Sequence, residues 1–431
     1  MTKRNENRPG YKKKKLIEEH LQWKNVALGK LGEWVGGGTP SKSNPEYWQQ
    51  ATIPWASSQD IKDIKLIDTI KKITEKAVRE SATNFVPEKS IIIVVRSGIL
   101  RHSLPIAKTI FPVAINQDLK ALIPDSQDYW VDYLVYVLGF NEKGILKTCS
   151  KVGTTVESIE FENLKKYQVL IPPLPEQKKI AEILSAWDRA IRQTCRLIEA
   201  KKRLKKGLMQ QLLTGRRRFP EFGPSVKRIK AVFYDYPSDW AHPKIGEIAK
   251  EILQKNQDNR KYTVLSCTKY DGFVNSLEYF GKKVYSDDTS NYKVIKKDQF
   301  GFPSNHIEEG SIGLLEHEPV GIVSPIYIVF QTDSKNVYPP YLYELLKTET
   351  YKHIFKSNTN SSVDRRGSLR WNEFSNIRVP LPSLKEQHRI HDVLATCDKE
   401  ISLLEKKEAA LKKQKQGLMQ KLLTGEVRVK L

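Results

Sequence analysis

The sequence predicts a mixed α/β protein with an internal repeat, in which two globular domains are separated by two long helices. Two nearly identical segments, GLMQQLLTG at 207–215 and GLMQKLLTG at 417–425, are the first sign of the repeat. The same offset aligns Glu176 with Glu386 and continues through both segments without a gap. Because 431 residues suffice for two or three domains, we expect two copies of one unit related by pseudo-two-fold symmetry.

The helical part of each copy carries apolar residues at three- and four-residue spacing, which is typical of a helix that buries one narrow stripe. In the first copy the stripe consists of Ile180, Leu184, Trp187, Ile191, Ile198, Leu208 and Leu212. In the second copy it consists of Ile390, Leu394, Cys397, Ile401, Leu404, Leu411, Leu418 and Leu422. A helix of about forty residues is roughly 60 Å long, too long for one small domain to cover. We therefore expect the two helices to pair as a coiled coil does.

The ends and interruptions of these helices also repeat. Pro175 and Pro382, together with a Thr-Gly pair at the end of each copy, are typical of helix boundaries. Gly207 and Gly417 interrupt strong helix formers at a cost of about 1 kcal/mol each. The same exception in both copies indicates either a close helix crossing or the docking of another subunit. A tolerated local break is the alternative.

The globular part of each copy contains many short strands, as mixed α/β domains do. In the first copy we expect a Gly- and Pro-rich loop at 36–48, strands at 52–57 and 90–95, and a helix at 129–138. In the second copy we expect strands at 261–266, 271–274 and 322–330, and a helix at 340–355. The expected segments are a basic tail at 1–22, a domain at 23–172, a helix at 173–217, a linker at 218–239, a domain at 240–382, a helix at 383–425 and a tail at 426–431.

The charge balance indicates a polyanionic partner. Lysine and arginine number 72 against 50 aspartate and glutamate residues, which gives a net charge of +22. Neutralising phosphates releases counterions, so a protein this basic is typical of nucleic-acid binders. A basic surface that serves only solubility is the alternative.

The cysteines and apolar runs bear on the cellular compartment. Cys149, Cys195, Cys267 and Cys397 are scattered and form no CxxC pair, which argues against disulfides and structural zinc. The apolar runs are too short to span a membrane, and the basic N-terminus lacks the apolar stretch of a signal peptide. We expect a cytoplasmic protein that binds no metal.

Recognisable catalytic motifs are absent from the sequence. It has no P-loop, no dinucleotide-binding G-x-G-x-x-G, no [DNS]-P-P-[YF] tetrapeptide of amino-methyltransferases and no convincing nuclease motif. We therefore expect a binding protein with no catalytic residue and no cofactor of its own. A stand-alone DNA-modifying enzyme and a coiled-coil nucleic-acid-binding scaffold remain alternatives.

Several polar loops carry the residue types that contact base edges and phosphates in DNA. The candidates in the first copy are Arg96, Ser97, Arg101, His102, Asn116, Gln117, Lys151, Thr154 and Thr155. The candidates in the second copy are Ser304, Asn305, His306, Asn358, Asn360, Arg365, Arg366 and Arg370. Ordinary solvated loops are the alternative for each of them.

The chain resembles the specificity (S) subunits of type I restriction–modification systems over most of its length. The resemblance rests on GGGTPSKSNPEYW, IPWASSQDIKD, INQDL, GTTVESI, LIPPLPEQKKIAEIL and GLMQQLLTGRRRFP, all in the first copy. It implies two target-recognition domains, each of which reads one half of a split sequence in double-stranded DNA. It also implies that the two helices run antiparallel and separate these domains.

The same resemblance implies partners that carry the chemistry. Two methyltransferase (modification) subunits would dock on the helices, and restriction (translocase) subunits would join them. AdoMet, ATP and Mg²⁺ would then belong to the partners. The second copy lacks the GGGTPSK loop and the RSG motif, and it has SPIY where the first has NQDL. We therefore expect the two domains to read different half-sites.

Overall fold

The computed structural model describes residues 23–151, 156–223, 227–359 and 368–431. Two compact units divide the chain. Unit 1 comprises the chain up to Thr194 together with Lys407–Leu431, and unit 2 comprises Cys195–Lys406. The long helices α6 (Leu174–Leu212) and α12 (Leu384–Leu423) each contribute one part to each unit.

Unit 1 contains a five-stranded sheet of order β2-β10-β7-β8-β4, antiparallel except for the β4–β8 pair. Its strands are β2 (Gly32–Gly36), β10 (Leu119–Pro124), β7 (Ile91–Val94), β8 (Ile106–Thr109) and β4 (Lys65–Leu66). A four-stranded sheet is formed by β5 (Lys71–Ile73), β3 (Ile53–Ala56), β9 (Val113–Ile115) and β6 (Asn84–Val86), in that order. A two-stranded sheet pairs β1 (Lys24–Ala27) with β11 (Gln168–Ile171). The short helices are η2 (Leu28–Lys30), η3 (Pro45–Tyr47), α2 (Glu75–Glu80), η4 (Gly98–Arg101), α3 (Val131–Phe140), α4 (Glu142–Cys149) and α5 (Phe161–Lys166).

Unit 2 contains an antiparallel four-stranded sheet of order β14-β21-β18-β19. Its strands are β14 (Ala249–Glu251), β21 (Tyr327–Thr332), β18 (Phe300–Pro303) and β19 (Gly313–Leu314). Three strand pairs add β12 (Arg228–Lys230) with β13 (Asp235–Pro237), β15 (Leu265–Thr268) with β16 (Gly272–Asn275), and β17 (Lys293–Lys296) with β20 (Val320–Val323). The short helices are η5 (Pro220–Phe222), α7 (Ile245–Ile248), α8 (Ser276–Phe280), η6 (Ile307–Glu309), α9 (Pro339–Leu346), α10 (Glu349–Asn358) and α11 (Trp371–Ser375).

The predicted repeat is visible in the sheets and in the buried hydrogen bonds. The order β14-β21-β18-β19 in unit 2 corresponds to β2-β10-β7-β8 in unit 1. Near the start of α6, the buried Gln177 side chain accepts a hydrogen bond from the Trp130 backbone N–H and donates to two backbone carbonyls. Near the start of α12, the buried Gln387 side chain makes the same three bonds, accepting from the Tyr338 N–H. The two copies therefore share one internal framework.

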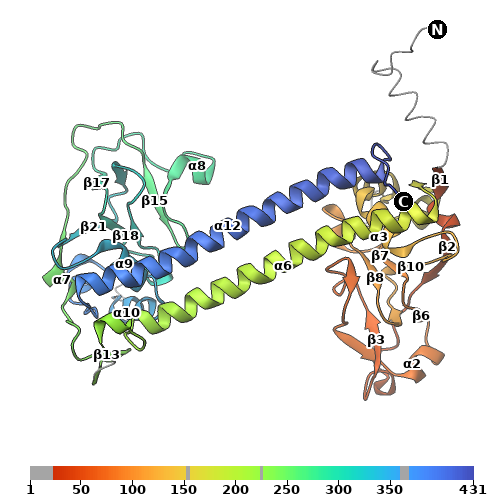
Figure 1. Cartoon of the computed structure of the whole chain (residues 1–431), viewed down its shortest axis with the longest axis horizontal. Helices are drawn as coiled ribbons and strands as arrows, with labels where there is room; N and C mark the ends of the chain where they lie inside the picture. Colours follow the sequence, from red (N-terminus) through yellow and green to blue (C-terminus); the bar gives the residue numbers. More distant parts are fainter. Residues whose placement is uncertain (1–22, 152–155, 224–226, 360–367) are drawn as a thin grey trace, which may run out of the picture. The chain divides into compact units, whose positions relative to one another are not determined.

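The two long helices run antiparallel within each unit (Figure 1). In unit 1, Asp188 of α6 pairs with Lys415 of α12 at 2.6 Å. In unit 2, Lys201 pairs with Glu400 at 2.6 Å, and Lys205, one turn later, pairs with Asp398 at 2.7 Å. The partner number falls as the α6 number rises, which confirms the antiparallel arrangement.

The repeated helix ends pack into the unit of the opposite copy. Leu212 and Leu213, at the end of α6, are buried in the core of unit 2. Leu422 and Leu423, at the end of α12, are buried in the core of unit 1. Each helix thus begins against its own globule and ends in the core of the other unit, so the two ends face equivalent surfaces and carry nearly the same sequence.

In the middle of each helix, the expected apolar stripe is not continuously buried. Ile180, Leu184, Ile198, Leu212, Ile390, Leu394, Cys397, Ile401 and Leu422 are buried, whereas Trp187, Ile191, Leu208, Leu404, Leu411 and Leu418 are only half-buried. Leu197, Leu204 and Leu403 are exposed. One neighbouring helix covers only one side of each rod, so full burial occurs mainly where the globules add a second surface.

Two other expectations about the helices need correction. Pro175 lies inside the first turn of α6, where its missing N–H costs nothing, and not before the helix. A Cβ added at Gly207 or Gly417 would meet no atom within 4 Å, so among the described residues neither glycine allows a close helix crossing. Docking of another subunit at these glycines remains a prediction.

The expected linker at 218–239 is structured in its described part. It contains η5 and the β12–β13 pair, and Tyr236 is buried in the core of unit 2. Gly215, which precedes it, has a φ of 62°, and Gly425 at the end of α12 has a φ of 72°. Left-handed glycines of this kind end helices, as the Thr-Gly pairs predict. Among the described residues, no helix is long and apolar enough to cross a membrane.

One charge cluster at the long helices differs between the copies. In unit 1, the Tyr136 hydroxyl donates to Asp188 at 2.6 Å. In unit 2, Glu344 occupies the corresponding place on α9, 3.6 Å from Lys205, which also pairs with Asp398. Burial raises the pKa of the Glu344 carboxyl, while Lys205 opposes that rise. Unit 2 therefore holds two carboxylates around one ammonium group where unit 1 holds one.

The substitution Glu344→Gln is expected to stabilise unit 2 at neutral pH. Because the pKa of Glu344 is raised in the folded state, the free energy of unfolding falls as the pH rises through and above the ordinary glutamate range. Glutamine removes that dependence, so thermal unfolding should occur at a higher temperature than in the native chain at pH 7.5 and at a similar temperature at pH 4. The exposed Glu318 of the same unit provides the control, since Glu318→Gln should leave the unfolding temperature nearly unchanged at both pH values. An unchanged pH dependence in Glu344→Gln would contradict this account.

Candidate nucleic-acid interface

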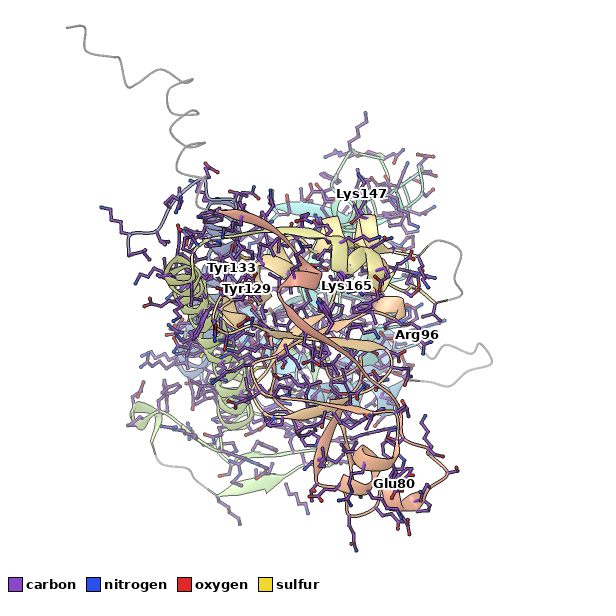
Figure 2. All side chains as sticks on the ribbon, turned by 90° about the vertical axis from the view of Figure 1, so that its right-hand side faces the viewer. Glu80, Arg96, Tyr129, Tyr133, Lys147 and Lys165 are labelled. Carbon is purple, nitrogen blue, oxygen red and sulfur yellow. The ribbon has the colours of Figure 1, made fainter. Side chains whose placement is uncertain are left out.

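Three loops of unit 1 meet where strand β7 ends. The Val95 N–H donates to the Asp118 carbonyl at 2.8 Å, and the Ile159 N–H donates to the Val95 carbonyl at 2.7 Å. The Ser97 N–H donates to the Glu157 carbonyl at 3.1 Å. We call residues 95–102, 116–118 and 156–159 the unit 1 frame. Figure 2 shows Arg96 of this frame on the opposite side of unit 1 from Tyr133, whose hydroxyl bonds the Leu170 carbonyl near the start of α6.

Two predicted arginines of the frame are held by carboxylates. Arg96 Nε donates to Asp118 Oδ1 at 2.7 Å, and Arg101 Nε donates to Glu157 Oε1 at 2.5 Å. The hydrogen bond from Arg101 lowers the pKa of Glu157. Both arginine side chains remain largely exposed. They can therefore meet a ligand from outside while their orientation is set from within the frame.

The predicted polar residues Asn116 and Gln117 differ in burial. Asn116 is only 5 % exposed, and its amide group bonds both the backbone N–H and the carboxylate of Asp118. Gln117 is exposed and accepts a hydrogen bond from the Thr39 hydroxyl at 2.5 Å. The structure thus places Asn116 behind the frame as a support and Gln117 at its surface.

The glycine-rich loop packs closely against the frame because its glycines have no side chain at the point of contact. A Cβ on Gly37 would lie 2.2 Å from the carbonyl oxygens of both Ile115 and Asn116. The Gly38 N–H donates to the Ile115 carbonyl at 3.0 Å. The glycines of GGGT therefore allow this loop to pack directly against the backbone that leads into Asn116 and Gln117.

The remaining candidates of unit 1 lie around the same frame. Ser97 and His102 flank helix η4, and Ser97 accepts a hydrogen bond from the Ile99 N–H. Lys151 is exposed, and its N–H donates to the Ser158 carbonyl at 2.9 Å. Thr154 and Thr155 lie outside the described residues.

Unit 2 repeats this backbone arrangement with different side chains. The Ser304 N–H donates to the Ile326 carbonyl at 3.3 Å, and the Leu369 N–H donates to the Ser304 carbonyl at 2.8 Å. We call residues 303–306, 324–326 and 368–370 the unit 2 frame. Asn305 and Ile326 stand where unit 1 has Arg96 and Asp118, so the second frame lacks that charge pair.

The other candidates of unit 2 are only partly gathered at its frame. Arg370 is exposed at the start of α11, next to Leu369, which binds Ser304. The Asn358 amide donates to the Ile354 carbonyl and so closes the end of its own helix α10. Asn360, Arg365 and Arg366 lie outside the described residues.

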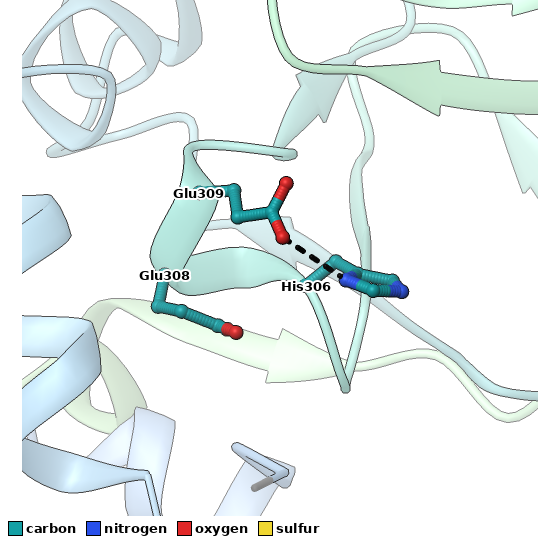
Figure 3. A group of neighbouring side chains, drawn as sticks. All are labelled: His306, Glu308 and Glu309. Carbon is teal, nitrogen blue, oxygen red and sulfur yellow. Dashed lines mark ion pairs between the residues drawn. The ribbon is translucent and has the colours of Figure 1, made fainter. Parts of the chain in front are cut away.

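His306 belongs to a group of three side chains that could present ligand atoms to a metal. Among the described residues, His306, Glu308 and Glu309 form the one such group, with their ligand atoms within 4.8 Å of one another. Figure 3 shows the Glu309 carboxylate directed at the His306 imidazole, and the two are 3.5 Å apart. Lysines 269, 352 and 356 line the same pocket as these glutamates. Two half-buried residues and one exposed residue from one turn fall short of an enclosed coordination sphere, so we assign no metal to them.

Two carboxylates of the unit 1 frame were not predicted as partners of its arginines. Asp118 and Glu157 orient the arginines, yet they lie 22 and 56 positions from their partners along the chain. Nothing in the local pattern joins residues that far apart. Only the acidic residue inside INQDL could have suggested the first pair.

The comparisons with known proteins show the family of the chain. The family model described as "Type I restriction modification DNA specificity domain" matches residues 21–201 and again residues 237–413. The type I restriction enzyme EcoR124I/EcoR124II specificity subunit of Escherichia coli is 40% identical over 171 residues, which cover 40% of this chain and 42% of that protein. The MjaVIII specificity subunit of Methanocaldococcus jannaschii is 26% identical over an alignment that covers 97% of each chain.

Solved structures share the fold at low sequence identity. The S subunit of a type I restriction-modification system from M. genitalium is 17% identical, with a TM-score of 0.55 over 93% of this chain and 96% of that one. A chain from a structure of type I R-M complex assembly and conformational transition is 16% identical, with a TM-score of 0.56 over 94% of this chain and 98% of that one. At this identity the likeness supports the two-domain fold.

Proposed function

Because the chain belongs to the type I restriction modification DNA specificity family, with one domain match in each copy, we propose that it is the sequence-specific DNA-binding subunit of a type I restriction–modification complex. The two frames carry this proposal. They share two backbone hydrogen bonds and differ in side chains, which is the arrangement needed to read two different half-sites. Unit 1 would read one half of a bipartite site in duplex DNA, and unit 2 the other half.

The helices would set the distance between the half-sites. Their pairing is antiparallel in each unit, and α6 and α12 are 39 and 40 residues long. At about 1.5 Å per residue these rods are roughly 60 Å long. Symmetric readers meet one face of the duplex when their sites lie near a whole turn apart. The net charge of +22 would supply phosphate contacts, which position the protein without reading sequence.

The catalytic chemistry would belong to partner subunits. The sequence lacks methyltransferase and ATPase motifs, so AdoMet, ATP and Mg²⁺ would bind two modification subunits and the restriction subunits. The exposed Leu197, Leu204 and Leu403 on the helices offer apolar area for such partners. We place the complex in the cytoplasm, where its DNA substrate lies.

Mapping of methylated bases in the host genome, with and without this chain, tests the proposal. We expect a bipartite motif with a fixed gap that is methylated only when the chain is present. Methylation that persists unchanged in the chain's absence would contradict it. So would a contiguous motif, because a single continuous site needs only one of the two frames.

A further inference from the structure

One exposed arginine of the unit 1 frame has its orientation fixed before any ligand arrives. Arg96 is 55 % exposed, and its Nε donates to Asp118 Oδ1 at 2.7 Å. The backbone N–H of Arg96 also donates to the Asp118 carbonyl, at 3.3 Å. The side chain and the backbone of Arg96 are therefore tied to the same residue.

Asp118 is in turn fixed by a buried residue. Its second carboxylate oxygen accepts a hydrogen bond from Asn116 Nδ2 at 3.0 Å, and its backbone N–H donates to Asn116 Oδ1 at 3.1 Å. The Asp118 carbonyl also accepts from the Val95 N–H at the end of β7. A side chain that is held in this way loses little further rotational freedom on binding. This chain of contacts runs from a buried asparagine to an exposed guanidinium.

The interaction through Nε leaves two parallel donors at the outer edge of the guanidinium. Among the residues that the structure describes, neither terminal nitrogen of Arg96 has a hydrogen-bond partner. Two parallel N–H donors match the O6 and N7 acceptors of guanine in the major groove. Adenine and cytosine present an amino group there and thymine presents a methyl group, so none of them offers two adjacent acceptors.

The neighbouring carboxylate favours a base over a phosphate as the ligand. Asp118 offsets the charge of Arg96, which weakens a long-range attraction to phosphate but leaves directed hydrogen bonds intact. An arginine that serves only phosphate contact gains nothing from a carboxylate beside it. The matching position in unit 2 is the neutral Asn305 beside Ile326, which has no such pair.

We propose that Arg96, positioned by Asp118, reads a guanine in the half-site recognised by unit 1. This inference rests on the proposed DNA-binding function and adds one base identity to it. Arg96 is then a specificity-determining residue, and Asp118 and Asn116 are positioning residues that act through it. The corresponding guanine preference is absent from the half-site of unit 2.

The test measures binding of the full chain to duplexes that carry its own motif, selected from a randomised duplex library. Each base pair of the motif is then replaced in turn by the three others. Arg96→Gln should weaken binding to the native motif by roughly 5- to 150-fold and should leave binding to the duplex without that guanine nearly unchanged. The matched control is Arg79→Gln, which removes one exposed positive charge from α2 of the same unit and should affect all duplexes equally.

Asp118→Asn separates positioning from charge. It removes a negative charge, so a purely electrostatic role predicts tighter binding to every duplex. We expect instead a reduced preference at the same base pair that Arg96→Gln affects, with the preferences in the other half-site retained. Retention of the other half-site also shows that the variant is folded.

Three outcomes would overturn the inference, and one would overturn the function beneath it. Equal loss on all duplexes in Arg96→Gln would make Arg96 a phosphate contact. An unchanged base preference in Arg96→Gln would show that Arg96 does not read the guanine. A different affected base pair in Asp118→Asn would show that Asp118 does not act through Arg96. If the native chain selects no bipartite motif from the library, the proposed function itself fails.

Discussion

Replacement of Arg218 with alanine is expected to lower the free energy of unfolding of unit 2 by about 3–5 kcal/mol. Arg218 donates to both carboxylate oxygens of Glu386, at 2.9 and 2.8 Å. The two side chains are only 6 % and 2 % exposed. Without the guanidinium, a buried carboxylate at the start of α12 would be left with its main charge partner missing. Urea unfolding of the full chain measures the loss, and hydrogen exchange locates it near Glu386.

The other copy provides the matched control for this substitution. Arg428 makes the equivalent pair with Glu176 at the start of α6, at 2.6 and 2.7 Å. Arg428 is 26 % exposed, and the Trp23 indole also donates to Glu176, at 3.0 Å. Arg428→Ala should therefore cost less, about 1–3 kcal/mol, because Trp23 still donates a hydrogen bond to the carboxylate and the more exposed site of Arg428 admits water once the guanidinium is removed.

A double variant distinguishes the lost charge partner from lost packing. Arg218→Ala combined with Glu386→Gln leaves no buried charge, so it should recover a large part of the stability that Arg218→Ala alone loses. If the double variant is as unstable as the single one, the account of Glu386 as an uncompensated charge is wrong. A cost well below 1 kcal/mol for Arg218→Ala would contradict it as well.

The long helices and the repeat were predictable because their signals are local and regular. The expected helices at 173–217 and 383–425 correspond to α6 at Leu174–Leu212 and α12 at Leu384–Leu423. The gapless alignment of the copies also anticipated the paired glutamines, Gln177 and Gln387. Apolar spacing and sequence identity both act over neighbouring residues, so the sequence displays them directly.

The exchange of helix ends was not predictable from the same signals. Leu212 and Leu422 show that an end of each copy is apolar, but the pattern alone does not name the surface that buries it. The β12–β13 pair was likewise hidden, since Pro, Gly and a cationic cluster at 218–239 are typical of linkers. Both features depend on contacts between distant parts of the chain.

In the candidate interface, too, local features were predictable and contacts between distant residues were not. Sequence composition placed Arg96, Gln117 and Ser304 in polar loops, and the structure brings these loops to the ends of β7 and β18. The carboxylates that orient Arg96 and Arg101 come from residues 22 and 56 positions away. Which arginine is held in a fixed orientation is therefore a property of the fold and not of the loop.

Exchange of residues 24–170 for the equivalent globule of another family member should have the largest effect on target choice. The exchanged segment holds the whole unit 1 frame and no residue of the unit 2 frame. Each mismatched base pair costs about 1–3 kcal/mol, so three mismatches would cost roughly 3–9 kcal/mol on the original site. A donor that keeps Tyr136 retains the hydroxyl contact with Asp188 that joins the globule to α6.

Methylation mapping of cells that carry the exchanged chain tests most directly whether two independent readers are held by a shared pair of helices. The account predicts a motif in which one half is new, while the other half and the length of the gap are those of the native chain. A motif in which both halves change, or in which the gap changes with the globule, would contradict it.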